Sequence, residues 1–407
     1  MLSACNPADQ KQPEINISDD SDPAVTPNNL LKFDSDTALS VQQIFQTYLS
    51  QVSSNFSELG SSLDTLLAST NALLLRPTDA ALTSAQESWS IAHTLFEQTA
   101  VHRYFSYRIS SEDESLRLFQ LHYQMHQWPI LAGYIDSVEG YMESGIVHDI
   151  NVDLTAETLR QQHGLFDVTE ATLGFHVIEF LLWGEPGGTS QRIAEDFRLI
   201  ETLTTDQQEN GLQLSQLGNN RRREMLRLTS GLLLEDFESS ALSWRQAIAR
   251  FESLADDISS EATLSLLLNS ASSMITQELL AKSLYPMLNN EFEVSLQSPY
   301  SQTSQSAVAA QMHGVESLIL ETPANDGTTL DTVLVSLSKD FEGLFYQNLD
   351  ASKACLVLLY NRIGASDFTG PSAAIEFETV ECINLLTNLV DQLNQIELTL
   401  PAIRIAI

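Results

Sequence analysis

The sequence lacks long apolar segments, has few basic residues and contains none of the short motifs of several common enzymes. No uninterrupted apolar run reaches the roughly 18 residues of a membrane-spanning helix, so none is predicted. Lysine and arginine number 20 against 54 acidic residues, and the net charge of −34 would repel nucleic-acid phosphates. H-E-x-x-H, G-x-S-x-G and G-K-[ST] are absent, so the common zinc peptidases, α/β-hydrolases and P-loop enzymes have no support.

Sustained alternation of apolar and polar residues, which is typical of half-buried strands, is also scarce. Apolar residues recur instead at intervals of three and four, as in residues 38–52 and 329–349. The chain has 407 residues, of which 43% are hydrophobic, and it is too long for one ordinary core. We therefore expect an all-α protein in which two antiparallel helical-bundle domains pack together.

The boundary between the predicted bundles falls in a polar, irregular segment that ends near Asn220. Residues 33–215 would then form the N-terminal bundle and residues 216–407 the C-terminal bundle. A long predicted helix opens the second bundle with RRREMLR, and we interpret its arginines as solvated or salt-bridged. Residues 1–32 are rich in Pro, Asp, Asn and Ser, which predicts a flexible tether.

Three cysteines are present, and each permits a specific interpretation. The sequence LSAC resembles the lipobox of bacterial lipoprotein precursors, which predicts a lipid on Cys5 and attachment to the cell envelope. Cys355 and Cys382 lie at similar heights on two predicted helices joined by a breaker-rich loop. They could form a disulfide in an oxidising compartment, or they could be two small buried hydrophobes that never meet.

One short stretch, GFHVIEFLLWG, places His176 and Glu179 inside an otherwise apolar segment. The spacing of DVTE, residues 167–170, fits a capping box and predicts a helix from there to Gly184. At spacing i, i+3 the pair shares one face of a buried helix, where unpaired charge is costly. Gly174 in the first turns suggests a close approach by another backbone or by a ligand.

Two interpretations of this pair stay open: a hydrogen-bonded pair that specifies packing, or two ligands of a metal ion. His93 and Glu97, at i, i+4 on another predicted helix, could complete a cluster of four. His122 and His126 also share a face, but they precede Trp-Pro, and we interpret them as exposed imidazoles outside the site.

The pattern G-x-H-x-x-E, formed here around His176 and Glu179, resembles the signature of the imelysin family of bacterial envelope proteins. A second segment, SWSIAHTLFEQT, is similar to the family's run with a tryptophan, a basic position and Y/F-E-Q. Trp89 and Glu97 match that run, whereas His93 stands where arginine is usual.

Further along, QWPI looks like the family's W-P element. The acidic residue that often follows is replaced by Leu131 or lies elsewhere, such as at Asp136. In the second half, residues 298–304 and 314–318 resemble the serine-aromatic-serine loop and the helix after it. The resemblance thus extends from about residue 35 to the end of the chain.

The resemblance implies two helical bundles with the His/Glu helix near their interface, in a periplasmic or lipid-anchored protein associated with iron uptake. It implies that His176 and Glu179, assisted by His93 and Glu97, hold a metal ion or orient its ligands. Iron is favoured, and zinc or copper also suits such groups. The residues expected to wall or cover this pocket are Gly174, Trp89, Trp128, Trp183, Tyr300 and Ser301.

Three functions follow from these observations. We favour an envelope lipoprotein, periplasm-facing and at the outer membrane, that binds a metal or metal chelate and works with a transport partner. The family also carries a peptidase label, so a metallopeptidase is the second hypothesis, although no general base with a water site is evident. The third is a non-catalytic interaction scaffold in which the His/Glu pair is structural.

Overall fold

The protein is described by a computed structural model over residues 30–253, 258–289, 291–338, 341–365 and 373–401. Within these residues the regular structure is helical, and the β-type pairing is an isolated bridge between Val138 and Tyr141. The expectation of an all-α fold is therefore confirmed. Cys5 and residues 1–29 of the predicted tether lie outside the described residues.

The helices have the following bounds: α1 Ser35–Leu75, α2 Asp79–Gln98, α3 Ala100–Ile109, α4 Glu112–His126, α5 Ala132–Ile135, α6 Ala156–Gln162, α7 Phe175–Trp183, η2 Ala194–Phe197, α8 Thr205–Glu209, η3 Leu214–Gln216, α9 Gly218–Ser253, α10 Ser260–Met274, η5 Ile275–Leu284, α11 Tyr285–Leu288, α12 Phe292–Ser295, α13 Ser304–Leu320, α14 Leu330–Leu337, α15 Phe341–Ala365 and α16 Ala373–Glu397. Of these, η2 and η3 are 3₁₀-helices, and η5 is a π-helix that continues α10.

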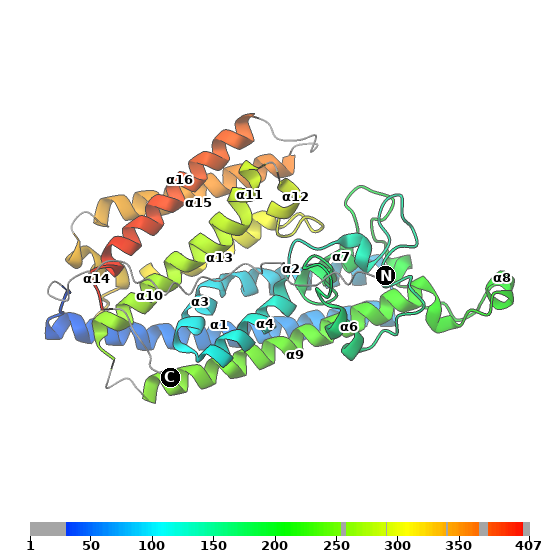
Figure 1. Ribbon diagram of the computed structural model, residues 1–407, viewed down its shortest axis with the longest axis horizontal. Helices are drawn as coiled ribbons and strands as arrows, with labels where there is room; N and C mark the ends of the chain where they lie inside the picture. Colours follow the sequence, from blue (N-terminus) through cyan, green and yellow to red (C-terminus); the bar gives the residue numbers. More distant parts are fainter. Residues whose placement is uncertain (1–29, 254–257, 290, 339–340, 366–372, 402–407) are drawn as a thin grey trace, which may run out of the picture.

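Two long helices, α1 and α9, extend along the long axis of the molecule and contact each other (Figure 1). Helix α1 begins where the Asp34 carboxylate accepts a hydrogen bond from the Thr37 backbone N–H at 2.8 Å. Helix α4 begins with a capping box formed by Ser111 and Glu114. These side chains satisfy N–H groups that a helix start leaves without partners.

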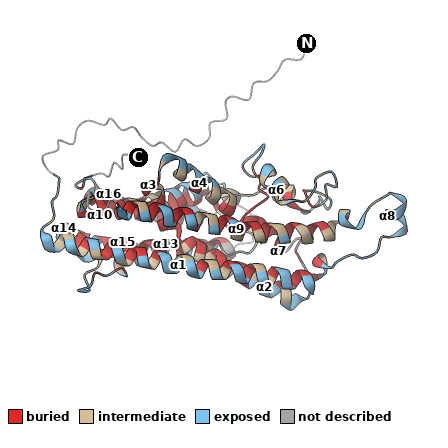
Figure 2. Ribbon diagram, turned by 90° about the horizontal axis from the view of Figure 1, so that it is seen from below, coloured by how far each residue is buried: buried red, intermediate tan, exposed pale blue. Residues whose placement is uncertain are grey.

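The buried apolar residues form two cores, and Figure 2 shows the buried faces turned inward. We call one the α7 core: it contains α2 and α7 together with residues 59–74 of α1 and 225–241 of α9. The other, the α16 core, contains α3, α10 and α13–α16 together with residues 41–52 and 244–251. Both long helices therefore contribute to both cores. A domain boundary near residue 215 stays a prediction.

Two of the segments predicted from their periodicity to be helical are helical in the structure. Residues 38–52 lie within α1, and residues 329–349 supply α14 and the start of α15. The arginines at the start of α9 are bound to other groups: Arg221 donates to backbone carbonyls, including those of Ile146 and Val147, and Arg222 pairs with Asp136.

Cys355 of α15 and Cys382 of α16 form a disulfide, with their Cα atoms 5.5 Å apart. Of the two interpretations left open by the sequence, the structure therefore contains the bonded one. The disulfide fixes the pairing of α15 and α16, which pack against each other in the α16 core.

A search of the described helices finds none that is both long enough and apolar enough to cross a bilayer.

Candidate metal centre

Three buried histidines from three helices converge at one point of the structure. His93 lies on α2, His126 is the last residue of α4, and His176 lies on α7. One nitrogen of each ring lies within 4.8 Å of the corresponding nitrogens of the other two. An ion bound tetrahedrally at about 2.1 Å holds its ligand atoms about 3.4 Å apart, so small ring shifts would complete a site.

Glu97, one turn after His93 on α2, adds a carboxylate oxygen to this group. Its Oε1 atom lies 2.5 Å from His126 Nε2 and 3.5 Å from His93 Nε2. The contact with His126 is a close ion pair, whereas the Nε2 atoms of His93 and His176 are buried without hydrogen-bond partners. Buried polar atoms nearly always have partners, so atoms that converge unsatisfied in this way are suited to an ion.

The charges of these groups suit cation binding. Burial lowers the pKa of His93 well below its ordinary value despite the nearby Glu97, and burial also lowers that of His176. Burial alone would raise the pKa of Glu97, but His126 beside it, with Arg103 and His93, holds it well below the usual range. The two imidazoles are therefore neutral and the Glu97 carboxylate ionised at neutral pH, which are the forms that ligate metals.

Glu179 lies on the other side of the His176 ring. Its Oε2 atom is 3.1 Å from His176 Nδ1, whereas the nitrogen that faces the centre is Nε2. The backbone N–H and the hydroxyl of Ser301 both donate to Glu179 Oε1 at 2.8 Å. This is the position of a carboxylate that orients a histidine ligand through its second ring nitrogen.

Burial raises the pKa of Glu179 to about 8, although the two hydrogen bonds from Ser301 favour the ionised form. The side chain is fully buried, so the cost of removing charge from water exceeds the gain from these bonds. The two buried carboxyl groups therefore differ in charge at neutral pH. Glu97 is held ionised with the help of the nearby Arg103, whereas Glu179 accepts its hydrogen bonds from the neutral Ser301.

Residues of the second half of the chain cover the cluster of three histidines and Glu97 on one side. Gln311 of α13 donates to Glu97 Oε2 at 2.6 Å, and Gln297 Nε2 lies 2.6 Å from His126 Nε2. With Ser301, these residues connect the histidine helices to the loop before α13 and to α13 itself. The His/Glu helix therefore contacts the second half of the chain, and its position between two separate bundles stays a prediction.

The start of α7 differs from the prediction. The DVTE segment does not cap it: Asp167 accepts hydrogen bonds from Thr169 in a turn, and α7 begins at Phe175. Gly174 precedes α7 with a φ of +96°, and an added Cβ would lie 2.5 Å from the Met125 carbonyl oxygen. The glycine therefore permits α7 to begin directly against the end of α4, as a close backbone approach requires.

The chain is similar to known proteins both in sequence and in fold. A family model described as Imelysin matches residues 52–399. The chain belongs to the imelysin family. A crystal structure from Parabacteroides distasonis, of a protein named as a candidate iron-regulated protein A precursor, has a similar fold with a TM-score of 0.59 and 13% identity. The similarity covers 91% of this chain and 97% of that one. No curated protein matches significantly.

The prediction that His122 and His126 are exposed is wrong for His126, which is 3% exposed and lies in the cluster. His122 is half-buried, one turn before it on α4. The sequence held a signal for this, because Leu118 and Met125 lie on the same helical face and are buried. In this imelysin-family chain the third imidazole of the cluster is therefore that of His126, which directly precedes Gln127-Trp-Pro.

The tryptophans differ in their relation to the cluster. The Trp89 ring stacks on His93 with centroids 4.7 Å apart, and its N–H donates to the Phe175 carbonyl at 2.8 Å. Trp183 meets Trp89 edge-on at 5.3 Å. Trp128 is buried, but no ring contact to the histidines is found for it in the described chain. Of the three tryptophans, Trp89 therefore adjoins the cluster directly and Trp183 packs against Trp89.

Tyr300 and Ser301 lie in the loop that the sequence predicted to cover the pocket. The Tyr300 ring packs on Phe180 of α7, with centroids 4.9 Å apart. Ser301 reaches Glu179, and its hydroxyl also contacts Thr303 at 2.8 Å. The loop thus lies over the same helix as the G-x-H-x-x-E pattern.

Asp136, which the sequence offered as one possible acidic residue after the W-P element, belongs to a separate buried ion cluster. Asp136 contacts Arg192 at 2.9 Å, Arg222 at 2.5 Å and His148 at 3.1 Å. Burial alone would raise the pKa of Asp136, but these neighbours hold it well below its ordinary value. Leu131 is exposed and takes no part. Asp136 thus joins the segment after the W-P element to α9 rather than to the histidines.

The first prediction concerns Gly174. Gly174→Ala should lower the free energy of unfolding by more than about 3 kcal/mol, because the methyl group meets the Met125 carbonyl and the backbone is strained. Gly187→Ala is the matched control, since Gly187 also has a positive φ but nothing within 4 Å of its added Cβ. Urea unfolding measures both, and equal losses would contradict the close contact.

The second prediction concerns Glu179. Its pKa in the folded protein, about 8, lies above the ordinary value of 4.5, so the folded state retains a proton that the unfolded state releases. Its contribution to stability is therefore present below about pH 4.5 and is lost as the pH rises toward 8. Glutamine does not titrate, so the stability of Glu179→Gln relative to wild type should increase over this range.

Urea unfolding of chelator-treated protein at several pH values measures this difference, which should grow by up to about 1.4 kcal/mol per pH unit. Glu209→Gln, at an exposed position, is the control. A difference between Glu179→Gln and wild type that stays constant with pH would contradict the assigned burial of a proton at Glu179.

Proposed function

We propose that the protein binds a divalent transition-metal ion at His93, His126, His176 and Glu97, with Glu179 as the group that orients His176. The observation that carries the proposal is the convergence of buried ligand atoms without hydrogen-bond partners at the meeting point of α2, α4 and α7. Three imidazoles and one carboxylate suit iron, zinc or copper.

Iron is the favoured ion, as the sequence analysis expected. The similar structure from Parabacteroides distasonis is of a protein named for iron regulation, and membership of the imelysin family supports a role in iron uptake. On this proposal the protein presents a metal ion, or a small chelate of it, to an envelope transport partner. The oxygen ligand Glu97 favours a hard or borderline ion over Cu(I).

Burial favours binding over proteolysis. The side chains of His93, Glu97, His126 and His176 are each at most 3% exposed. A metallopeptidase needs an open coordination position that a peptide bond can reach. Glu179, which could serve as a base, is behind His176 and is covered by Ser301. The scaffold hypothesis does not account for the unsatisfied atoms at the centre.

We further propose that the protein faces the periplasm, held to the outer membrane through a lipid on Cys5. The LSAC sequence supports the lipid, and the disulfide between Cys355 and Cys382 suits an oxidising compartment.

Labelling of an expressing bacterium with a radioactive fatty acid tests the lipid. Wild type behind a lipoprotein leader should incorporate the label and sediment with membranes, whereas Cys5→Ser should do neither. Cys355→Ser, which keeps Cys5, should still be labelled. An unlabelled wild type would contradict the anchor.

The metal proposal is tested by loading chelator-treated protein with Fe(II) without oxygen, and separately with Zn(II) and Cu(II), followed by desalting and elemental analysis. Wild type should retain about one ion per chain. His126→Ala and His176→Ala should each retain less than about a tenth of that, because each removes a ligand. Glu179→Gln should weaken affinity about 10- to 100-fold through the orientation of His176.

His313→Ala is the matched control, since the His313 side chain is 46% exposed on α13 and lies beside Glu316 rather than in the cluster. Circular dichroism confirms that each variant is folded. Wild type without an ion above background would sink the proposal, and so would His126→Ala with the full content of the wild type.

A further inference from the structure

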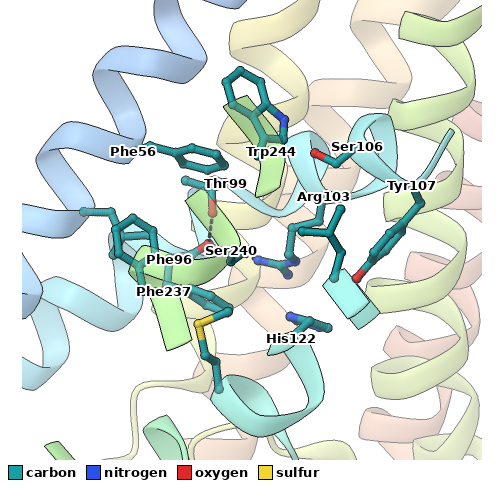
Figure 3. Close-up of a pocket in the computed structure, with 13 residues that line it drawn as sticks. Phe56, Phe96, Thr99, Arg103, Ser106, Tyr107, His122, Phe237, Ser240 and Trp244 are labelled. Atoms are coloured by element: carbon teal, nitrogen blue, oxygen red, sulfur yellow. Dashed lines mark hydrogen bonds between the residues drawn. The ribbon is translucent and has the colours of Figure 1, made fainter. Parts of the chain in front are cut away.

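A cavity that none of the proposed metal ligands lines lies beside the metal centre. It is enclosed by α1, α2, α3, α4 and α9 (Figure 3). Its walls are largely aromatic and apolar, and they include Phe56, Phe96, Phe237 and Trp244. Phe96 separates the cavity from the centre, because its ring lies 5.2 Å from His126 and 6.0 Å from His122 between centroids.

Two nitrogen donors are directed into this cavity. In Figure 3 the Arg103 guanidinium and the His122 ring point toward one another across it. The Arg103 side chain is 10% exposed, and its Nη2 atom is buried without a hydrogen-bond partner. His122 Nδ1 is likewise buried and unpartnered. A guanidinium N–H that has lost its water and gained no acceptor is costly, so an acceptor in the cavity would stabilise it.

The neighbours of Arg103 leave its Nη2 atom without a hydrogen-bond acceptor. Its Nη1 donates to the Phe96 carbonyl at 3.2 Å, and its guanidinium lies 4.7 Å from the Phe96 ring centroid. The Glu97 carboxylate is 3.9 Å from Nη2, too far for a hydrogen bond, and already accepts from Gln311. Glu278, the other nearby acid, is paired with Lys282 and Tyr104.

None of the residues that line the cavity is acidic, although acidic residues outnumber basic ones 54 to 20 in the chain. The lining offers hydroxyl groups instead, from Tyr107 and Ser240. A planar guanidinium fork, an imidazole N–H and hydroxyls are the donors that recognise a planar oxyanion. The aromatic walls limit the ligand to a few atoms.

We propose that this cavity binds a small planar oxyanion, a carboxylate or bicarbonate, through Arg103 and His122. The site is separate from the proposed metal ligands and does not depend on them. Arg103 also lies 3.9 Å from Glu97, so Arg103 adjoins both proposed sites.

Acetate is the probe, used on chelator-treated full-length protein with sodium acetate replacing sodium chloride at constant ionic strength. Acetate should raise the melting temperature, and its methyl protons should show saturation transfer from the protein. Acetamide, the neutral molecule of the same shape, should do neither. Bicarbonate should displace acetate if it is the better ligand, which distinguishes the two sources of the oxyanion.

Arg103→Gln should reduce the saturation transfer at least fivefold. Arg108→Gln, an exposed arginine on the same helix, is the matched control and should behave as wild type. If Arg103→Gln fails to fold, Ser240→Asp decides, because it places a like charge in the cavity wall and should also abolish binding.

His176→Ala should keep acetate binding even where it loses metal, so failure of one proposal is distinguishable from failure of the other. Equal responses to acetate and acetamide would overturn the anion site. So would full saturation transfer in folded Arg103→Gln or Ser240→Asp.

Discussion

The contact between Gly174 and the end of α4 is the constraint on which the histidine cluster depends. The Met125 carbonyl lies where any side chain at Gly174 would begin, so α7 can start against the last turn of α4 only because that position is glycine. His126 follows Met125 directly, and His176 follows Gly174 by two residues. One short backbone contact thus sets the separation of two of the three imidazoles, and the third is held by Trp89, which bonds to the same helix.

Burying two carboxyl groups near three imidazoles is costly, and the second half of the chain offsets part of that cost. Gln311 satisfies one oxygen of Glu97, and Ser301 supplies two hydrogen bonds to Glu179. Buried ionisable groups contribute to stability only where such partners are complete. At the Nε2 atoms of His93 and His176 they are incomplete. The polar atoms at the edge of the cluster therefore have hydrogen-bond partners, whereas ring nitrogens at its centre do not.

Local patterns in the sequence predicted much of this arrangement. The i, i+3 spacing of His176 and Glu179 and the i, i+4 spacing of His93 and Glu97 describe contacts within one helix, and both pairs are close in the structure. The all-α class follows from periodicity in the same way. The prediction for His126 was wrong because the apolar Leu118 and Met125 on its side of α4 indicate only that this face is buried, and which helix covers it is decided by tertiary packing.

The start of α7 was also mispredicted, since the capping-box spacing at residues 167–170 is matched by a simple turn and the true start uses a positive φ. Gln297 and Gln311 carried no signal, because amides are common in such sequences and these two act more than 100 residues away from their partners.

Long helices that pass from one core into the other have a mechanical consequence. The two cores cannot move apart without breaking the backbone hydrogen bonds of α1 near residues 52–59 and of α9 near residues 241–244. The cover over the buried histidines on the side of Gln297 and Ser301 is instead a short loop, held to them by a few side-chain contacts.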